Sequence, residues 1–346
     1  MSEPILKVEN LNITFTQYVS GLKRRDLHVI QGLDIDLHQG EIMAIVGSSG
    51  SGKSLLANSI LGILPENATV TGSMTYQGEE LTQQKKEGLR GKEICLIPQS
   101  VNYLDPLMKV GKQVQLSIKD KAQAKREQRR VFAEYGLGEE VDNMYPFQLS
   151  GGMTRRVMVS TAVLSGAKVI IADEPTPGLD EKALHETLHF FTELRDQGAS
   201  IILITHDILA ALHIADRIAI FYAGSTLEVA NREDFAGQGE NLRHPYTQAL
   251  WNALPENGFS PIPGSQPSPL QLPVGCLFHE RCHHCDESCV SARPESEIMD
   301  GGLVRCHKAT IIHEHVHSHG GVTHSHRHAH VEGEEAHSHE TDNTGA

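Results

Sequence analysis

Short apolar runs alternate with helix-like segments along the first two-thirds of the chain. The runs Glu41 to Val46, Val169 to Ala172 and Ile201 to Ile204 are almost wholly apolar, and longer amphipathic segments such as Lys53 to Leu64 and Glu181 to Arg195 lie between them. Strands that are apolar on both faces and joined by helices are typical of a largely parallel sheet covered on both sides. The pattern predicts an α/β fold for residues 1–255.

The stretch from residue 100 to 165 departs from this alternation. Residues 119–135 are charged and rich in residues that favour helix. We therefore expect a helical subdomain at about residues 100–165, inserted into the α/β domain.

A change of composition near residue 255 marks the end of that domain. A stiff connector follows, because proline continues neither a helix nor a sheet; its prolines are Pro261, Pro263, Pro267, Pro269 and Pro273. We expect a small cysteine-rich module at residues 256–310. Residues 311–346 have almost no apolar content, so a disordered histidine-rich tail is expected there.

The net charge and the absence of long apolar runs narrow the possible partners. The 346 residues carry a formal net charge of −14, which argues against nucleic acid as a partner. No apolar run approaches the roughly 20 residues that span a bilayer. The first residues also lack a basic patch followed by an apolar core, so we expect a cytosolic chain.

The segment after the apolar run Glu41 to Val46 fits the phosphate-binding pattern G-x-x-x-x-G-K-S/T. Its residues are Gly47, Ser48, Ser49, Gly50, Ser51, Gly52, Lys53 and Ser54. The glycines permit a sharp turn and close approach to phosphate, and the helix that begins near Lys53 adds the positive end of its dipole. Lys53 is expected to reach the β- and γ-phosphates of ATP, and the Ser54 hydroxyl to hold Mg²⁺.

Two further apolar strands end in residues that can act on a nucleotide. Asp173 and Glu174 close the first, where we expect Asp173 to bind Mg²⁺ and Glu174 to polarise the attacking water as general base. His206 follows the second, at the sheet edge where ligands of such folds collect. It could donate to the γ-phosphate or orient the water.

The segment Leu149–Met153 reads LSGGM and lies between these motifs in the sequence. Together the motifs resemble the ATP-binding subunits of ABC transporters over about residues 5 to 250. The resemblance implies a P-loop ABC ATPase core that works as a head-to-tail pair. In such a pair Ser150, Gly151 and Gly152 of each subunit cap the γ-phosphate bound by the other.

The same resemblance implies roles for three residues outside the central motifs. Gln99 matches the Q-loop glutamine, which senses Mg²⁺ and couples to the membrane subunits. Phe15 matches the aromatic that stacks on adenine, with Tyr18 as the alternative. Asp180 matches the D-loop aspartate.

Two departures from the family pattern concern communication across the pair of subunits. Arg155-Arg156 stands where the family often has Gln-Arg, and Pro177-Gly178 precedes Leu179 where the family often has Ser or Ala. Neither change removes a group that touches phosphate or metal, so ATP hydrolysis is still expected.

Residues outside the nucleotide motifs indicate the subfamily. These residues resemble those of the oligopeptide, dipeptide and nickel importers. Met153 is typical of the first of the two unlike ATPases in such importers. The matching segments are Leu104-Asp105-Pro106, Gly111-Lys112-Gln113, His244 to Leu250, Ile262-Pro263-Gly264, Gly275 to Phe278 and Arg281-Cys282. The resemblance implies four partners: a second ABC ATPase of LSGGQ type, two transmembrane permease subunits and an extracytoplasmic substrate-binding protein. It also implies a peripheral position on the cytoplasmic face of the inner membrane.

Four cysteines of the C-terminal module are spaced C-x5-C-x6-C-x16-C: Cys276, Cys282, Cys289 and Cys306. Four thiolates can hold Zn²⁺ or an iron–sulfur cluster, and the same positions match cysteines of the related peptide-importer subunits. The wide gaps lack the tight pairs of zinc modules, which favours a four-iron four-sulfur cluster over Zn²⁺. Reduced cysteines without a metal are the alternative.

The tail holds ten histidines, mostly as His-x-His. They are His313, His315, His317, His319, His324, His326, His328, His330, His337 and His339. Imidazole binds Ni²⁺, Cu²⁺ and Zn²⁺, so the tail favours nickel or a nickel chelate as cargo, with the tail buffering or sensing the metal; compositional drift is the alternative. The cysteine module favours di- or oligopeptides instead. Two alternatives from other classes remain. One is a soluble ABC protein of DNA repair or translation, although neither a second cassette nor a long coiled-coil insertion is found. The other is a P-loop metallochaperone GTPase, although no guanine-specifying motif is found.

Overall fold

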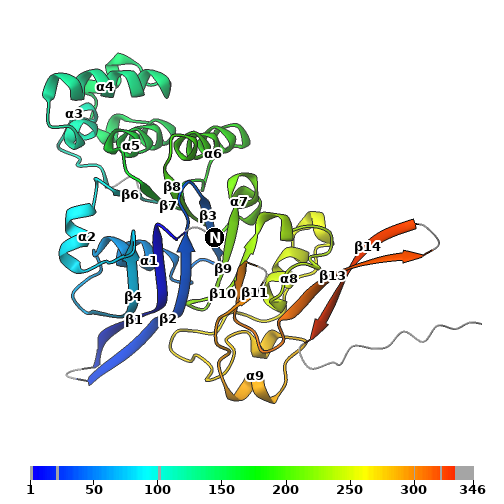
Figure 1. Ribbon diagram of the computed structural model, residues 1–346. Coiled ribbons are helices and arrows are strands. Elements are labelled where there is room, and N and C mark those ends of the chain that lie inside the picture. Colours follow the sequence, from blue (N-terminus) through cyan, green and yellow to red (C-terminus); the bar gives the residue numbers. More distant parts are fainter. Residues whose placement is uncertain (1–2, 21–22, 100–102, 300, 320–321, 332–346) are drawn as a thin grey trace, which may run out of the picture. The chain divides into compact units, whose positions relative to one another are not determined.

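The computed structural model describes residues 3–20, 23–99, 103–299, 301–319 and 322–331, and the chain divides into two compact units (Figure 1). The first comprises Met1–Arg232 together with Ser265–Pro273, and the second comprises Glu233–Gly264 together with Val274–Ala346. Part of the proline-rich connector therefore returns to the first unit.

A mainly parallel sheet forms the centre of the first unit. Its strands lie in the order β10 (Ser225–Asn231), β9 (Arg217–Tyr222), β3 (Ile42–Gly47), β8 (Ser200–Thr205), β7 (Val169–Asp173) and β6 (Ile94–Ile97). Neighbours from β9 to β6 are parallel, and β10 is antiparallel to β9. Every residue of β3, β7 and β8 is buried. The predicted covered parallel sheet is therefore confirmed.

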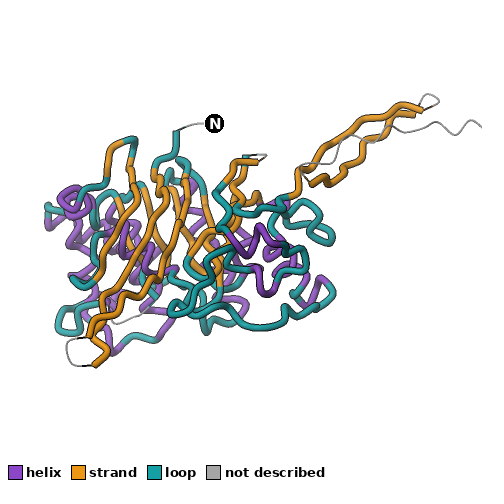
Figure 2. Tube along the Cα trace, turned by 90° about the horizontal axis from the view of Figure 1, so that it is seen from below, coloured by secondary structure: helices purple, strands orange, loops and turns teal. Residues whose placement is uncertain are grey.

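A second, antiparallel sheet lies in the same unit, and Figure 2 shows strands of the unit running side by side, with helices beside them. Its order is β2 (Lys23–Leu37), β1 (Leu6–Ser20), β4 (Ala68–Tyr76) and β5 (Glu79–Glu80). Several bulges interrupt the β1–β2 register. Phe15 lies on β1, opposite Leu27 of β2 and Ala68 of β4.

The helices of the first unit follow the strands as the alternation predicts. They are α1 (Lys53–Leu61), α2 (Gln83–Leu89), α3 (Val110–Val114), α4 (Lys121–Glu134), α5 (Gly151–Ser165), α6 (Glu181–Asp196) and α7 (Ile208–Ile214). Helix α1 ends earlier than expected because Gly62 takes the left-handed conformation at its C-cap. No helix in the described part of the chain is long and apolar enough to cross a membrane.

Helices α3, α4 and α5, which follow β6 and precede β7 in the sequence, pack together. Their shared core contains Val110, Val114, Phe132, Leu137, Val141 and Val157, all buried. Apolar positions three and four apart supply this face, while most charged residues of α4 are exposed. The small core gives α5, which begins at the LSGGM segment, a rigid support.

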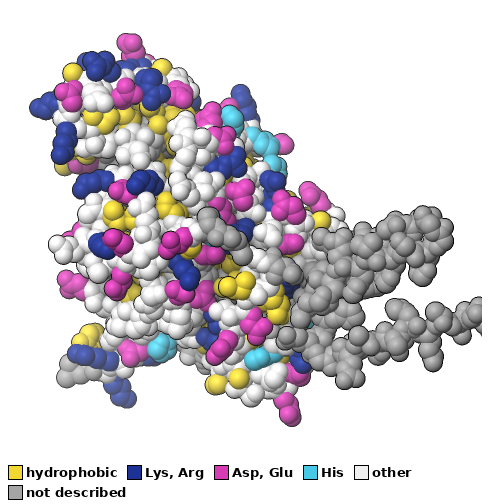
Figure 3. Space-filling model, in the orientation of Figure 1, with side chains coloured by type: hydrophobic (Ala, Val, Ile, Leu, Met, Phe, Trp, Pro, Cys, Tyr) yellow, Lys and Arg dark blue, Asp and Glu magenta, His cyan; other side chains and the backbone are white. Residues whose placement is uncertain are grey.

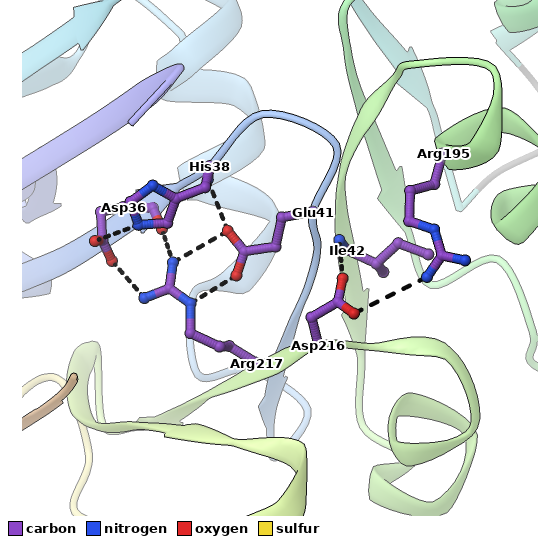
Figure 4. A network of polar contacts seen from close by, with 7 residues as sticks. All are labelled: Asp36, His38, Glu41, Ile42, Arg195, Asp216 and Arg217. Atoms are coloured by element: carbon purple, nitrogen blue, oxygen red, sulfur yellow. Dashed lines mark hydrogen bonds and ion pairs between the residues drawn. The ribbon is translucent and has the colours of Figure 1, made fainter. Parts of the chain in front are cut away.

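A polar network joins β2, the start of β3 and the start of β9 (Figure 4). Arg217 donates to Glu41 at 2.6 Å and to Asp36 at 3.1 Å. Asp216, the preceding residue, accepts from the backbone N–H of Ile42 at 2.9 Å. These hydrogen bonds fix the end of the sheet opposite the carboxyl ends of its parallel strands.

The second unit contains short elements and one long hairpin. They are α8 (Pro245–Asn252), α9 (Glu287–Ser291), β11 (Glu297–Met299), β12 (Gly302–Val304), β13 (Thr310–His319) and β14 (Val322–Val331). The expectation of disorder here stays a prediction, while the strands β13 and β14 pair along this stretch. Its alternation of histidine with other residues has the period of a strand, a feature that low apolar content concealed.

Candidate nucleotide site

The phosphate-binding loop connects β3 to α1 as the motif predicts. Two glycines in it are required by close contacts. A Cβ on Gly47 would lie 2.7 Å from the carbonyl oxygen of Phe221, and one on Gly52 would lie 2.5 Å from Cδ1 of Ile30. Gly52 also has a φ of 95°, which favours glycine.

Lys53 is the buried cation of the loop. Its Nζ donates to the carbonyl oxygens of Gly47 at 2.7 Å and Ser48 at 3.0 Å, and lies 3.7 Å from Oε1 of Glu174. Burial lowers the pKa of Lys53, and the negative charges of Glu174 and Asp173 act against this shift. The ammonium group is thus held in the loop by oxygen atoms that phosphate oxygens can replace.

Asp173 ends β7 and fits the role of a Mg²⁺ ligand. Its side chain is buried, it hydrogen-bonds Ser54, and its Oδ1 has no hydrogen-bond partner among the described residues. Burial raises the pKa of this carboxyl. A buried, unpaired carboxylate oxygen beside a hydroxyl matches the all-oxygen ligand set that Mg²⁺ prefers.

Glu174 lies between Lys53 and His206. One carboxylate oxygen accepts from Nδ1 of His206 at 2.8 Å, so this imidazole carries its proton on Nδ1 when neutral. The backbone of Glu174 has a φ of 47°, an uncommon conformation for a residue other than glycine. Such local strain is frequent at catalytic positions, and no motif in the sequence predicts it.

The LSGGM segment runs into the start of α5. Ser150 is the N-cap, and its Oγ accepts from the backbone N–H of Met153 at 3.3 Å. A Cβ added to Gly151 or Gly152 would meet no atom within 4 Å, and both residues are exposed. The backbone at the N-terminus of α5 is thus exposed. Such exposure is required if this end of the helix is to cap a phosphate bound by another subunit.

Arg155 and Pro177, which stand at the two positions that depart from the family pattern, contact each other. Arg155 donates to the carbonyl oxygen of Pro177 at 2.6 Å, and its second terminal nitrogen is buried without a hydrogen-bond partner in the described chain. Burial lowers the pKa of Arg155. Beyond Pro177, Asp180 caps α6 by accepting from Ala183 at 2.8 Å. The arginine thus links α5 to the D-loop.

Two predicted residues lie at the edge of the site, and one further residue was missed. Gln99 follows β6 and is exposed, while Phe15 is partly buried on β1. The Ser48 hydroxyl donates to Oε1 of Gln266 at 2.8 Å. Gln266 belongs to the connector, and no sequence motif places it beside the phosphate loop.

The cysteines and histidines give no metal centre in the described residues. All six cysteines are free, and no group of three or more His, Cys, Asp or Glu side chains within the described ranges is arranged to hold a metal ion. Burial, followed by neighbouring cysteines, raises the pKa of Cys276 to about 11 and that of Cys306 to about 12. The predicted cluster, with Cys282 and Cys289 as its other ligands, stays a prediction.

For the histidine-rich tail, the structure describes the backbone of residues 310–319 and 322–331. The β13–β14 register places His313 opposite His328, His315 opposite His326, and His317 opposite His324. His337 and His339, also predicted as metal ligands, lie outside the described residues.

Comparisons with known proteins agree with the geometry. The family model "ABC transporter" matches residues 30–177, and "Oligopeptide/dipeptide transporter, C-terminal region" matches residues 227–289. Among solved structures, the dimeric ATP-binding cassette MJ0796 with ADP and Pi covers 66% of this chain at 26% identity and a TM-score of 0.57, and 98% of that chain is covered. Another, cbiO1 from Clostridium perfringens, gives 72% and 99% coverage, 27% identity and a TM-score of 0.56.

These findings define an ABC-type ATPase, whose ATP hydrolysis is coupled to transport. The oligopeptide transport ATP-binding protein OppD of Escherichia coli K12 is 36% identical over 324 residues, which cover 89% of this chain and 94% of OppD. The dipeptide transport ATP-binding protein DppD of Bacillus subtilis is 34% identical, with 88% and 94% covered. The chain belongs to the ATP-binding proteins of the oligopeptide/dipeptide transporter family, and the resemblance found in the sequence is confirmed.

Proposed function

We propose that the chain energises the import of di- or oligopeptides. The observation that carries this proposal is the likeness to OppD and DppD over almost the whole chain, including the C-terminal region. Nickel, the cargo first predicted, has no specific support in these comparisons. Membership of the ABC family also makes the GTPase alternative wrong.

The proposed assembly follows from the importer family. The chain would pair with a second ABC ATPase, and both would attach to two permease subunits on the cytoplasmic face of the inner membrane, supplied by a substrate-binding protein. Ser150, Gly151 and Gly152 would cap the γ-phosphate in the partner's site, Asp180 would lie at the contact, and Gln99 would couple to the permease. Open backbone at the start of α5 supports the first of these roles.

We propose that hydrolysis depends on five side chains of this chain. Lys53 would bind the β- and γ-phosphates, while Ser54 and Asp173 would hold Mg²⁺, which neutralises phosphate charge when bound. Glu174 would accept the proton of the attacking water. His206 would keep the Glu174 carboxylate oriented through the 2.8 Å hydrogen bond and direct its other ring nitrogen toward the phosphate. Phe15 would stack on adenine.

The cargo is tested with the complete importer in proteoliposomes that contain its substrate-binding protein. ATP hydrolysis should rise on adding di- or oligopeptides to the binding protein, and should not respond to Ni²⁺ without peptide. A response to Ni²⁺ alone would restore the nickel interpretation. The matched control is the importer carrying Glu174→Gln, which should show no response to either.

We further propose that the tail binds a divalent metal ion and that the cysteines hold an iron–sulfur cluster or Zn²⁺. The tail proposal is supported by the cross-strand register of its histidines. Calorimetry with Ni²⁺ on the full chain and on a full-length variant with all ten tail histidines changed to Gln tests it, and equal affinity would contradict it. For the cysteines, anaerobic purification and metal analysis that finds neither iron nor zinc would contradict the centre.

A further inference from the structure

Three exposed histidines gather on two neighbouring helices of the first unit, away from the tail. His185 and His189 lie one turn apart on α6, and His213 lies in the last turn of α7. Figure 3 shows histidine side chains together on the surface over these helices. The rings of His185 and His213 have centroids 5.4 Å apart at an interplanar angle of 62°.

The hydrogen bond of His213 defines which of its nitrogens can bind a ligand. Nδ1 lies 2.7 Å from the carbonyl oxygen of Leu209. A carbonyl only accepts, so Nδ1 carries the hydrogen and the lone pair of the neutral ring is on Nε2. Metal-binding histidines usually have this arrangement, in which the second nitrogen donates to a backbone carbonyl and fixes the ring.

The separation of the two rings suits a shared metal ion. Imidazole nitrogen binds Zn²⁺ at about 2.0–2.1 Å, so two rings on one tetrahedral ion have centroids roughly 5 Å apart. His189 can approach from the next turn of α6. At present its Nε2 lies 3.3 Å from Glu193, so water would complete the coordination of a two-histidine site.

We infer that His185 and His213 form a surface site for a divalent transition metal ion, of the class that prefers imidazole: Zn²⁺, Ni²⁺ or Cu²⁺. The proposal depends neither on the cargo nor on the tail. It rests on the ring separation and on the fixed tautomer of His213.

A metal ion at this site would connect two segments that leave the nucleotide site. Helix α6 begins at its N-cap Asp180, and α7 begins at its N-cap Asp207, which directly follows His206. A bridge between the helices restricts movement of one against the other. We therefore expect the bound metal ion to slow ATP hydrolysis as well as to stabilise both helices.

Hydrogen–deuterium exchange of the full-length chain with and without Ni²⁺ tests the site locally. Backbone exchange in α6 and α7 should slow with Ni²⁺ in the unchanged chain. His185→Gln and His213→Gln should each abolish the protection and weaken Ni²⁺ binding at this site about tenfold or more.

The matched control is His28→Gln, which removes another exposed imidazole of the first unit and retains the tail. Its α6 and α7 should be protected as in the unchanged chain. Equal protection in all four proteins, or none in the unchanged chain, would overturn the proposal. Exchange without Ni²⁺ should be the same in all four, which shows that the substitutions leave the fold intact.

Discussion

Glu174 is the residue on which the contacts of the nucleotide site converge. It lies 3.7 Å from the ammonium of Lys53, accepts from His206 at 2.8 Å, and is only 8% exposed. Glu174→Gln preserves size and one acceptor but removes the proposed general base, so kcat for ATP hydrolysis should fall by about 10²–10⁴-fold while ATP binding persists. Phosphate release and equilibrium ATP binding measure the two effects, and a near-normal kcat would contradict the general-base role.

His244 provides a second prediction, on stability. It is fully buried, its Nδ1 accepts from the backbone N–H of Tyr246 at 2.9 Å as the N-cap of α8, and burial lowers its pKa to about 3. The unfolded chain therefore binds this proton near pH 6.5 and the folded chain does not. Stability should fall as pH drops from about 6.5 toward 3, by about 1.4 kcal/mol per pH unit.

The test compares denaturant unfolding of the C-terminal unit at pH 7 and pH 5 in the full chain and in His244→Asn. Asparagine can still cap α8 but does not titrate. The variant should lose less stability over this interval than the unchanged chain, by about 2 kcal/mol. The same pH dependence in both proteins would show that His244 does not cause it.

At the scale of elements, the contact between α5 and the D-loop joins the two positions that depart from the family pattern, Arg155 and Pro177. Arg155→Gln cannot reach Pro177 with the same charged donor, so we expect unfolding free energy to fall by about 1–2 kcal/mol and kcat to fall several-fold with the KM for ATP little changed. Arg156→Gln is the matched control, because Arg156 donates to Tyr135 and Gly152 instead. Equal effects of both variants would remove any special role of the D-loop contact.

Predictability also differs between elements. The phosphate loop, the Asp173-Glu174 pair and His206 could be predicted because each follows an apolar strand directly, and parallel strands bring their carboxyl ends to one edge. The contact of Arg155 with Pro177 could not, since it joins a helix to a loop 22 residues away through a single backbone oxygen. The β13–β14 pairing was not predicted because the low apolar content of the tail outweighed its strand-like alternation of histidine with other residues.

At the scale of the whole molecule, the connector is the feature that sequence reasoning missed most clearly. Gln266 reaches Ser48 across 218 positions of sequence, and the prolines around it indicated only a stiff spacer. Ser265–Pro273 clusters with the first unit although the residues on both sides of it belong to the second. The nucleotide site is therefore in direct contact with the segment that precedes the cysteine module.

This contact leads to the last prediction. The Ser48 hydroxyl is in the loop that phosphate must enter, so nucleotide binding should disturb its hydrogen bond to Gln266. Backbone exchange of residues 265–273 should therefore increase when Mg-ATP binds to the Glu174→Gln chain, in which ATP persists. In the Gln266→Leu variant, residues 265–273 should already exchange faster before ATP is added, and ATP should cause no further change. Gln271→Leu, in the same connector, is the control and should respond to ATP like the parent chain. Unchanged exchange in the parent chain on ATP binding would mean that the connector does not respond to the nucleotide.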